Sequence, residues 1–426
     1  MLDLKYIRQN PALVREGATK KHIVCDIDRI LELDAASREM GVEIDQLRQG
    51  QKQAGSKIAQ ASPEERGQLV ADQQATKAEL KAQEERQQQV TVELQELLLR
   101  VPMPPAEDVP DGKDDAQNAE LRKWGKPRSF DFEARSHQDL GELHGWIDVE
   151  RGARLAGSRN YLLKGEIVLL ESAILRFALD QMVERGFTPV TVPTLVRTEA
   201  MRGTGYFPGG EDQAYRCDDR DDLWLVGTAE VPLTAMHAGE ILDVADLPIK
   251  FVAQSSCYRR EAGTYGKDTR GLYRVHQFQK VEQVIIDVAD EQKSLEHHAA
   301  ILNNAETLMQ SLDLPYRVVN VCGGDLGQGQ VQKFDIETWM PSREGYGETH
   351  SASRFHDFQS RRLDLRYRGE DGKVAHCHTL NNTVAASTRM LIALLENHQN
   401  EDGSVNVPEP LRPYMGGRDL IGKAGS

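Results

Sequence analysis

The chain has 426 residues, more than one ordinary hydrophobic core organises, and this length predicts two or three domains. With 39% hydrophobic and 28% charged residues, the composition excludes an intrinsically disordered chain. The formal net charge of −15 argues against a general affinity for nucleic acid, but the charge is unevenly spread. Residues 1–100 carry 15 basic against 17 acidic side chains, so a phosphate backbone would be repelled least there.

The N-terminus and the cysteines bear on the compartment. The first residues, MLDLKYIRQN, are charged early and lack the apolar core of a signal peptide, and no apolar run reaches the roughly 18 residues of a membrane helix. The cysteines are odd in number and scattered, which is typical of reduced thiols and not of a disulfide framework. We therefore expect a cytoplasmic protein without a membrane partner.

The first hundred residues predict a long antiparallel helical hairpin. Two series of positions alternate in steps of four and three, and Ser62 and Pro63 between them are typical of a helix start. Glutamines in the second series make the seam polar, which favours a solvated arm; an ordinary coiled-coil oligomerisation arm is the alternative. The seam positions are Leu33, Ser37, Met40, Ile44, Leu47, Gln51, Ala54 and Ile58, then Leu69, Gln73, Thr76, Leu80, Gln83, Gln87, Val90, Leu94 and Leu97.

A proline-rich stretch marks the strongest domain boundary. The segment VPMPPAEDVPDG after Arg100 holds four prolines, which cannot continue a helix. We expect a helical arm over 1–103, a linker over 104–115 and a second domain over 116–426.

The second domain predicts an α+β fold with a mainly antiparallel sheet flanked by helices, because long strand–loop–strand units outnumber βα repeats. Helices are expected over 164–185, 290–312 and 384–398. Strands are expected over FTPVTVP (187–193) and over 250–261, 271–288, 315–322, 331–339 and 361–368.

The stretch CYRREAG (257–263) carries the most informative chemistry. Arg259 and Glu261 are two residues apart, which on a strand places both on one face. Arginine grips phosphate, a glutamate accepts hydrogen bonds from an amine, and Phe278 on the next predicted strand offers a ring for stacking a base. A nucleotide site is one interpretation; a surface ion pair over a sheet is the other.

Three weaker patterns predict no cofactor site. The glycine-rich 322–330 precedes a strand and not a helix, so it fails as a dinucleotide fingerprint and is expected to be a turn. Residues 263–269 contain a Gly-Lys pair without P-loop spacing. His376, Cys377 and His378 lack further ligands at metal spacing, so a structural role is favoured there.

Several segments taken together resemble the seryl-tRNA synthetases, a class II family. These segments are TAEVPL (228–233), CYRREAG (257–263), DTRGLYRVHQF (268–278), KVE (280–282), HTLN (378–381), LLENHQ (394–399) and LRPYM (411–415). Their order and intervals match, and the resemblance extends over essentially the whole chain, including the helical arm.

The resemblance implies an active site. Arg259 and Arg389 would be catalytic, on the α- and γ-phosphates of ATP. The serine site would consist of Thr228, Ala229, Glu230, Glu282 and Thr383. The ATP site would use Arg259, Arg260, Glu261, Phe278, Glu348, Thr349, His350, Ser351 and Arg389, with Glu348 and Ser351 holding Mg²⁺.

The sequence also departs from the family pattern. Asn382, Val384 and Thr388 stand where the third class II motif usually has glycines, and Gly347 stands where an arginine is usual. His350 and Arg354 replace a Ser or Thr and an Asn. These changes leave the ATP contacts around 347–354 open.

The resemblance implies that the enzyme activates serine with ATP and transfers it to the 3′-terminal adenosine of tRNA(Ser), with tRNA(Sec) a further candidate. It implies a homodimer, with Pro193 in the segment that forms its interface. A paralogue that delivers serine to another acceptor and a non-catalytic coiled-coil binding protein are the alternatives; the intact arm argues against the first, the complete site set against the second.

Overall fold

The computed structural model describes residues 1–218, 220–263 and 271–422 and divides the chain into two compact units, 1–104 and 105–426. Among the described helices, none combines the length and apolar character that a membrane crossing requires. The two units are built on different principles.

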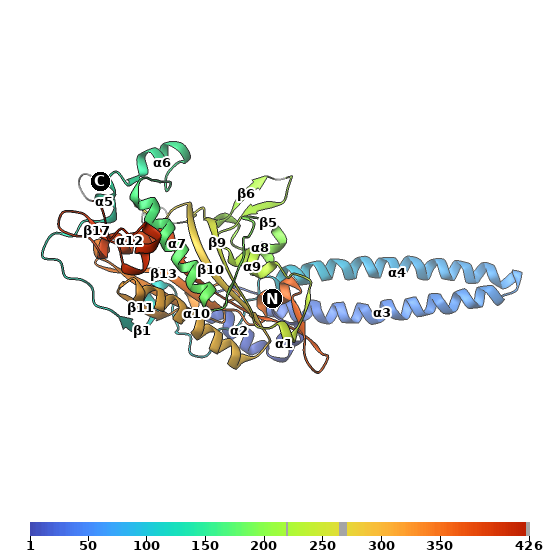
Figure 1. Cartoon of the computed structure of the whole chain (residues 1–426). Helices are drawn as coiled ribbons and strands as arrows, with labels where there is room; N and C mark the ends of the chain where they lie inside the picture. Colours follow the sequence, from blue (N-terminus) through green and yellow to red (C-terminus); the bar gives the residue numbers. More distant parts are fainter. Residues whose placement is uncertain (219, 264–270, 423–426) are drawn as a thin grey trace. The chain divides into compact units, whose positions relative to one another are not determined.

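The first unit is entirely helical. Two short helices, α1 (Leu4–Gln9) and α2 (Pro11–Lys20), precede the long helices α3 (Ile27–Gln60) and α4 (Pro63–Leu98), which run side by side (Figure 1). Near the start of α3 the buried Asp34 accepts two hydrogen bonds of 2.9 Å from Arg8 and one of 3.2 Å from Arg38. This ion pair ties α1 to α3, because a buried carboxylate must be paired.

The turn between the long helices is defined by a capping box. The Ser62 hydroxyl accepts from the Glu65 amide, and the Glu65 carboxylate accepts from the Ser62 amide, with Pro63 in the first helical turn. Two of the amides that a helix start leaves unpaired are thereby satisfied. The predicted helical hairpin and its turn are confirmed.

The predicted seam is confirmed position by position. Every seam residue expected between Leu33 and Ile58, and between Leu69 and Leu97, is partly or fully buried, while most of their neighbours are exposed. Two glutamines of the seam make hydrogen bonds across it: Gln87 Nε2 donates to the Ser37 carbonyl at 3.2 Å, and Gln83 Nε2 donates to Glu43 at 3.2 Å.

The second unit is organised around an eight-stranded sheet. Its strand order is β1-β11-β12-β13-β16-β10-β9-β4, and every pairing is antiparallel except that of β4 with β9. The strands span Ala119–Trp124 (β1), Tyr316–Asn320 (β11), Gln332–Met340 (β12), Gly345–Arg354 (β13), His378–Ala386 (β16), Gln277–Asp287 (β10), Ile249–Tyr258 (β9) and Thr188–Pro189 (β4). The mainly antiparallel α+β fold is confirmed.

Helices cover the sheet because its strands are apolar on both faces. On β10, Ile285 packs into the cluster formed with α7 (Glu166–Glu184), α10 (Glu291–Ser311) and α12 (Ser387–Asn397). The neighbouring Val284 and Ile286 pack into a second cluster with α9 (Glu230–Ala235) and Leu363 at the end of α11 (Phe358–Leu363). Alternate residues thus serve opposite faces. In Figure 1, α7 and α10 lie along the strands.

Short elements complete this unit. They are α5 (His137–Leu143), β2 (Ile147–Asp148), α6 (Val149–Ala156), β3 (Leu162–Leu163), β5 (Leu195–Arg197), α8 (Thr198–Thr204), β6 (Tyr215–Asp218), β7 (Leu223–Leu225), β8 (Ile241–Asp243), β14 (Arg366–Arg368), β15 (Val374–His376), β17 (Val405–Asn406) and β18 (Leu420–Ile421). The start of this unit is attached to its body: the Ala106 amide donates to the Val331 carbonyl at 2.9 Å, and Val109 packs against Val321 and Leu326.

Five predicted elements are wrong in part. The strands expected over 250–261 and 271–288 are limited to Ile249–Tyr258 and Gln277–Asp287. Three more elements differ as follows. The strand expected over 361–368 is the end of α11 followed by β14, because Asp364 adopts a left-handed conformation that ends the helix. The helix expected from 384 begins at Ser387, after β16, whose polar residues concealed a strand. The strand expected over 187–193 is reduced to Thr188–Pro189, since Pro189 lacks the amide that pairing needs.

Candidate active site

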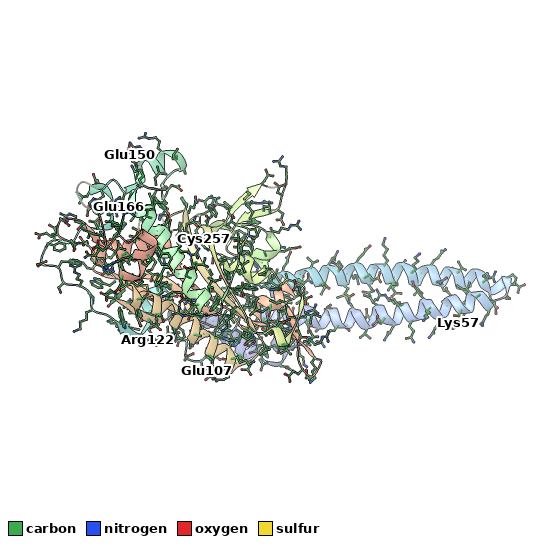
Figure 2. All side chains as sticks on the ribbon, in the orientation of Figure 1. Lys57, Glu107, Arg122, Glu150, Glu166 and Cys257 are labelled. Atoms are coloured by element: carbon green, nitrogen blue, oxygen red, sulfur yellow. The ribbon has the colours of Figure 1, made fainter. Side chains whose placement is uncertain are left out.

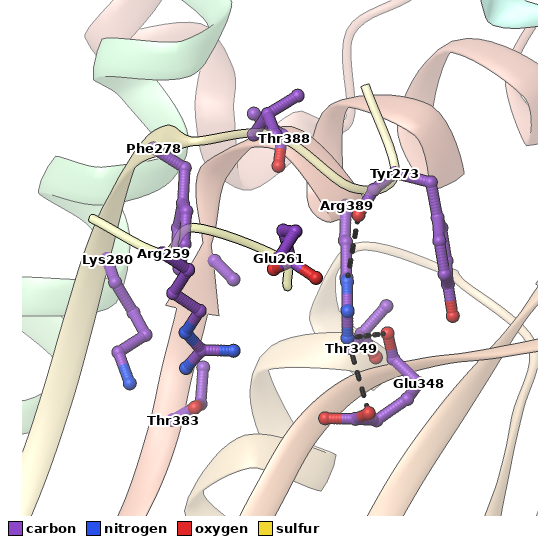
Figure 3. Close-up of a pocket in the computed structure, with 12 residues that line it drawn as sticks. Arg259, Glu261, Tyr273, Phe278, Lys280, Glu348, Thr349, Thr383, Thr388 and Arg389 are labelled. Carbon is purple, nitrogen blue, oxygen red and sulfur yellow. Dashed lines mark hydrogen bonds and ion pairs between the residues drawn. The ribbon is translucent and has the colours of Figure 1, made fainter. Parts of the chain in front are cut away.

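A polar cleft lies where β10, β13 and β16 meet the start of α12 (Figure 3). Its lining brings together residues that are more than a hundred positions apart in the sequence. They are Arg259, Glu261, Tyr273, Val275, Phe278, Lys280, Glu348, Thr349, Thr383, Ala386, Thr388 and Arg389.

The Arg259 and Phe278 pair forms one wall of the cleft. The Arg259 guanidinium lies 5.3 Å from the centre of the Phe278 ring, and its Nε donates to the Gly227 carbonyl at 3.4 Å. The peptide of Arg259 is fixed as well, since its amide donates to the His276 carbonyl at 2.9 Å. A cation and an aromatic face are thus held ready for an anionic and a planar group.

Glu261 lines the cleft in an unexpected backbone conformation. Strand β9 ends at Tyr258, and Glu261 has φ of 52°, so the predicted single strand face shared with Arg259 is wrong. The left-handed turn nevertheless brings the carboxylate into the cleft, where its Oε2 lies 3.4 Å from Arg274 Nη1.

Arg389 crosses the opposite side of the cleft. Its Nη1 donates to the Glu348 carbonyl at 2.8 Å and lies 3.4 Å from Glu348 Oε2, while its guanidinium lies 4.6 Å from the centre of the Tyr273 ring. Figure 3 shows these side chains facing each other. Desolvation on its own would raise the pKa of Glu348, but the positive charges of Arg389 and Lys333 outweigh it and lower that pKa.

A β-bulge brings Glu348 and Ser351 to the same face. The pairing of β12 with β13 shifts by one residue between Ile336 and Glu337, so residues three apart in β13 point the same way. Ser351 Oγ donates to Asp335 Oδ1 at 2.7 Å, which leaves its lone pairs for a cation. Burial raises the pKa of Asp335, and the nearby Glu348 adds to this rise against the effect of Lys333.

A second group of polar residues lies deeper. On one face of β10, Phe278, Lys280 and Glu282 follow each other at alternate positions. Lys280 Nζ lies 2.5 Å from Glu282 Oε2 and donates to Thr228 Oγ1 at 2.6 Å, and Thr383 Oγ1 donates to Glu282 Oε2 at 3.4 Å. All four of these polar residues are buried.

Glu230 lies next to this group, at the start of α9. It accepts from the Tyr206 hydroxyl at 2.9 Å and from Gln359 Nε2 at 2.8 Å. Burial, together with the charge of Glu282, raises the pKa of Glu230 to about 7. Ala229 is buried in the apolar cluster beneath α9.

Two residues of the predicted ATP set lie elsewhere. Arg260 is exposed, with its guanidinium 5.4 Å from the centre of the Tyr215 ring. His350 is buried under the sheet, where Nδ1 contacts Thr349 Oγ1 at 2.8 Å and Nε2 contacts the Val384 carbonyl at 3.0 Å. Burial lowers the pKa of His350 to about 4, so the ring is neutral at physiological pH.

The chain is similar to known proteins over its whole length. Residues 1–105 match the family model of the seryl-tRNA synthetase N-terminal domain, and residues 215–398 match that of the class II tRNA synthetase core domain (G, H, P, S and T). A serine–tRNA ligase of Deinococcus radiodurans is 47% identical over 424 residues, 99% of each chain. The chain belongs to the seryl-tRNA synthetase family. It is a class II ligase that joins serine to tRNA.

Solved structures of the family extend the match to three dimensions. The seryl-tRNA synthetase of Pyrococcus horikoshii, complexed with ATP, superposes with a TM-score of 0.93 at 40% identity and full coverage of both chains. The cytoplasmic serine–tRNA ligase of Naegleria fowleri, complexed with AMP, gives a TM-score of 0.86 at 32% identity over 98% of this chain and 96% of that one.

The departures from the seryl-tRNA synthetase pattern have local explanations. A Cβ at Gly347 would lie 3.0 Å from the Tyr273 ring, which occupies the space of a larger side chain. Arg354 is buried away from the cleft and donates to Glu291 at 2.6 Å. Asn382 Nδ2 donates to the Ile301 carbonyl of α10 at 2.7 Å, so it anchors a helix.

Sequence reasoning missed several residues of the site. Tyr273 and Lys280 line the cleft, Asp335 binds Ser351, and Tyr206 and Gln359 hold Glu230. Only Lys280 left a readable signal, since it falls between Phe278 and Glu282 in the alternation of a strand face.

Proposed function

We propose that the cleft forms seryl-adenylate from serine and ATP, and that the enzyme then transfers serine to the 3′-terminal adenosine of tRNA(Ser), with tRNA(Sec) a further candidate acceptor. The observation that carries the proposal is the convergence of two arginines and an aromatic ring in one cleft, with a buried hydroxyl-and-carboxylate group directly behind its lining residues Lys280 and Thr383. The first part suits a nucleotide triphosphate and the second suits a small polar amino acid.

The reaction joins two anions, since the serine carboxylate attacks the α-phosphorus of ATP. Arg259 would hold the α-phosphate and Arg389 the γ-phosphate, and both would offset the charge that develops at phosphorus. Phe278 would stack on adenine, and Glu261 would accept from its amine. Because both substrates would be fixed in contact, positioning supplies much of the acceleration and no general base is required.

The serine end would select for the hydroxyl. Thr228, Glu230, Glu282 and Thr383 present polar atoms in a buried space, and the hydrogen-bonding capacity that their protein partners leave unused is costly unless a ligand takes it up. A site of this type rejects alanine because its polar groups would stay unpaired, and it rejects bulkier side chains by size.

The oxygen atoms around Glu348 fit a divalent cation that accompanies ATP. Glu348 and Ser351 share one face, and Ser351 keeps its lone pairs because its proton is donated to Asp335. When bound, Mg²⁺ would neutralise phosphate charge. Activity should therefore require Mg²⁺ or Mn²⁺ and survive zinc chelators; stoichiometric zinc in the purified enzyme would contradict this assignment.

The working unit would be a homodimer in the cytoplasm. Helix α7 exposes apolar side chains, with Val168 38%, Leu169 42% and Val183 44% exposed, which suits burial against a second copy. The five cysteines are free thiols, as in a reducing compartment. Sedimentation equilibrium would test the dimer, and a monomer at micromolar concentration would overturn it.

The proposal is tested by serine-dependent exchange of pyrophosphate into ATP, followed by charging of tRNA(Ser). Exchange should be much faster with serine than with threonine or alanine. If exchange proceeded but no tRNA were charged, the enzyme would deliver serine to another acceptor. Absence of exchange with any amino acid would contradict the proposal altogether.

A further inference from the structure

One buried cation of the serine end has no role in the mechanism above. Lys280 is 5% exposed, and its ammonium lies between Thr228 Oγ1 at 2.6 Å and Glu282 Oε2 at 2.5 Å. Figure 3 shows Lys280 at the end of the cleft that also holds Arg259 and Thr383. A buried lysine that contacts two proposed substrate-binding groups can determine whether each of them donates or accepts a hydrogen bond to the substrate.

The contacts of Thr228 fix the direction of its hydrogen bonds. Its Oγ1 accepts from the Lys280 ammonium and from the Glu230 amide, at 2.6 and 3.2 Å. Neither of these groups can accept a hydrogen bond, so both lone pairs of the hydroxyl are occupied. The proton of Thr228 is therefore left for an acceptor supplied by a ligand.

The contacts of Glu282 leave one of its carboxylate oxygens as a hydrogen-bond acceptor. Lys280 and Thr383 both contact Oε2, and within the described part of the chain Oε1 has no hydrogen-bond partner. Glu282 Oε1 therefore remains as an acceptor. Since Thr228 Oγ1 and Glu282 Oε2 touch the same nitrogen, they lie no farther apart than two hydrogen-bond lengths.

We propose that Lys280 is a positioning residue that determines specificity for a hydroxyl, by holding Thr228 as a donor and Glu282 as an acceptor. An aliphatic hydroxyl accepts one hydrogen bond and donates another, so the serine side chain satisfies both groups at once. A methyl group satisfies neither, and an ammonium group can only donate. The inference rests on the proposed serine site.

Removing the ammonium should release this constraint. In Lys280→Met the Thr228 hydroxyl loses one of its donors and can turn toward Glu282, so the two groups pair with each other and no longer need a substrate hydroxyl. We expect the ratio of kcat/KM for serine over alanine, measured by pyrophosphate exchange, to fall at least about tenfold, because the cost of unpaired polar groups disappears. The KM for serine should rise more than that for ATP.

The control is Lys164→Met, which removes another lysine–carboxylate pair. The half-exposed Lys164 Nζ lies 3.0 Å from the buried Asp148 outside the cleft, so the serine-to-alanine ratio should stay unchanged. A merely structural role of Lys280 would slow serine and alanine activation equally. An unchanged ratio in a folded Lys280→Met enzyme would therefore overturn the proposal.

Two further measurements do not depend on that variant folding. In Lys280→Ala, added ethylammonium should restore part of the ratio, since it returns a cation to the vacated space. In the unmodified enzyme, 3-fluoroalanine matches serine in size but cannot donate, so its kcat/KM should be at least about tenfold lower. Equal activation of 3-fluoroalanine and serine would overturn the proposal.

The serine site itself is tested separately by Thr228→Ala and Glu282→Ala. If these changes leave the KM for serine unaltered, the site assignment fails. If they raise it while Lys280→Met changes neither that KM nor the ratio, only the role of Lys280 fails.

Discussion

The hairpin seam and the deeper end of the cleft both place polar side chains in partly or fully buried positions, yet they use them differently. In the seam, Gln83 donates a hydrogen bond of 3.2 Å to the exposed carboxylate of Glu43, and Gln87 donates one of 3.2 Å to the Ser37 carbonyl. In the cleft, Thr228 and Glu282 are held at 2.5–2.6 Å by a shared lysine. The polar side chains of the seam make single hydrogen bonds between helices. In the cleft, the shared lysine would determine which neighbouring atoms donate hydrogen bonds and which accept them.

Deleting the arm should produce the largest effect and should separate the two regions. With residues 27–98 replaced by a short Gly-Ser linker, tRNA charging should fall about 10³-fold, since the arm would supply the phosphate contacts that raise specific above non-specific affinity. Pyrophosphate exchange with serine should persist. Normal charging by the truncated enzyme would show that the arm serves oligomerisation instead.

Point changes on the arm sharpen that test. Lys52, Lys57 and Lys77 are exposed, whereas Arg48 and Lys81 are paired with Glu84 and Glu85. Figure 2 shows Lys57 projecting from α3. Replacing the first three with alanine should weaken charging and reduce its salt dependence, more than replacing the two paired residues.

Arg259→Ala should slow adenylate formation by about 10²-fold or more, a loss typical of one electrostatic contact with a transition state. The matched change is Arg260→Ala, one residue away, whose exposed guanidinium packs on Tyr215; its loss should be less than about tenfold. Single-turnover kinetics would measure both. A change in the serine KM alone would contradict the role of Arg259.

Glu230→Gln should alter the pH dependence of stability. The pKa of Glu230 in the folded protein is about 7, above its ordinary 4.5, so the folded state keeps a proton that the unfolded chain releases between those values. Wild-type stability therefore falls from about pH 4.5 to pH 7, by about 3 kcal/mol, and the variant escapes this loss. Thermal unfolding should show a gap in favour of the variant that grows from pH 5 to pH 8; a constant gap would contradict the cause.

Gln83→Leu should have the smallest effect. Replacing a half-buried amide by an apolar side chain should stabilise the hairpin by about 1 kcal/mol. Hydrogen exchange of α3 and α4 amides would measure the gain, and serine activation should not change. Faster exchange would show that the contact of Gln83 with Glu43 matters more than apolar burial.

The two regions also differ in how far the sequence predicted them. The seam follows from a period of seven residues, which is local information, and each position from Leu33 to Leu97 agreed with the structure. The resemblance correctly placed Arg259, Phe278 and Arg389 around one cleft. Asp335 and Gln359 escaped prediction because their importance arises from pairing across strands and helices. The burial of His350 could not be predicted for the same reason, since only the fold shows its ring in the core.

The distribution of fully buried residues along the hairpin has a mechanical consequence. Ile30, Leu33 and Ile44 on α3, and Leu94 and Leu98 on α4, are fully buried, whereas seam positions from Leu47 to Val90 around the Ser62 turn are covered only in part. The free energy that resists separation of the helices must therefore decline toward that turn. The two helices of the arm should therefore separate and bend more easily near the Ser62 turn than near residues 30–44 and 94–98.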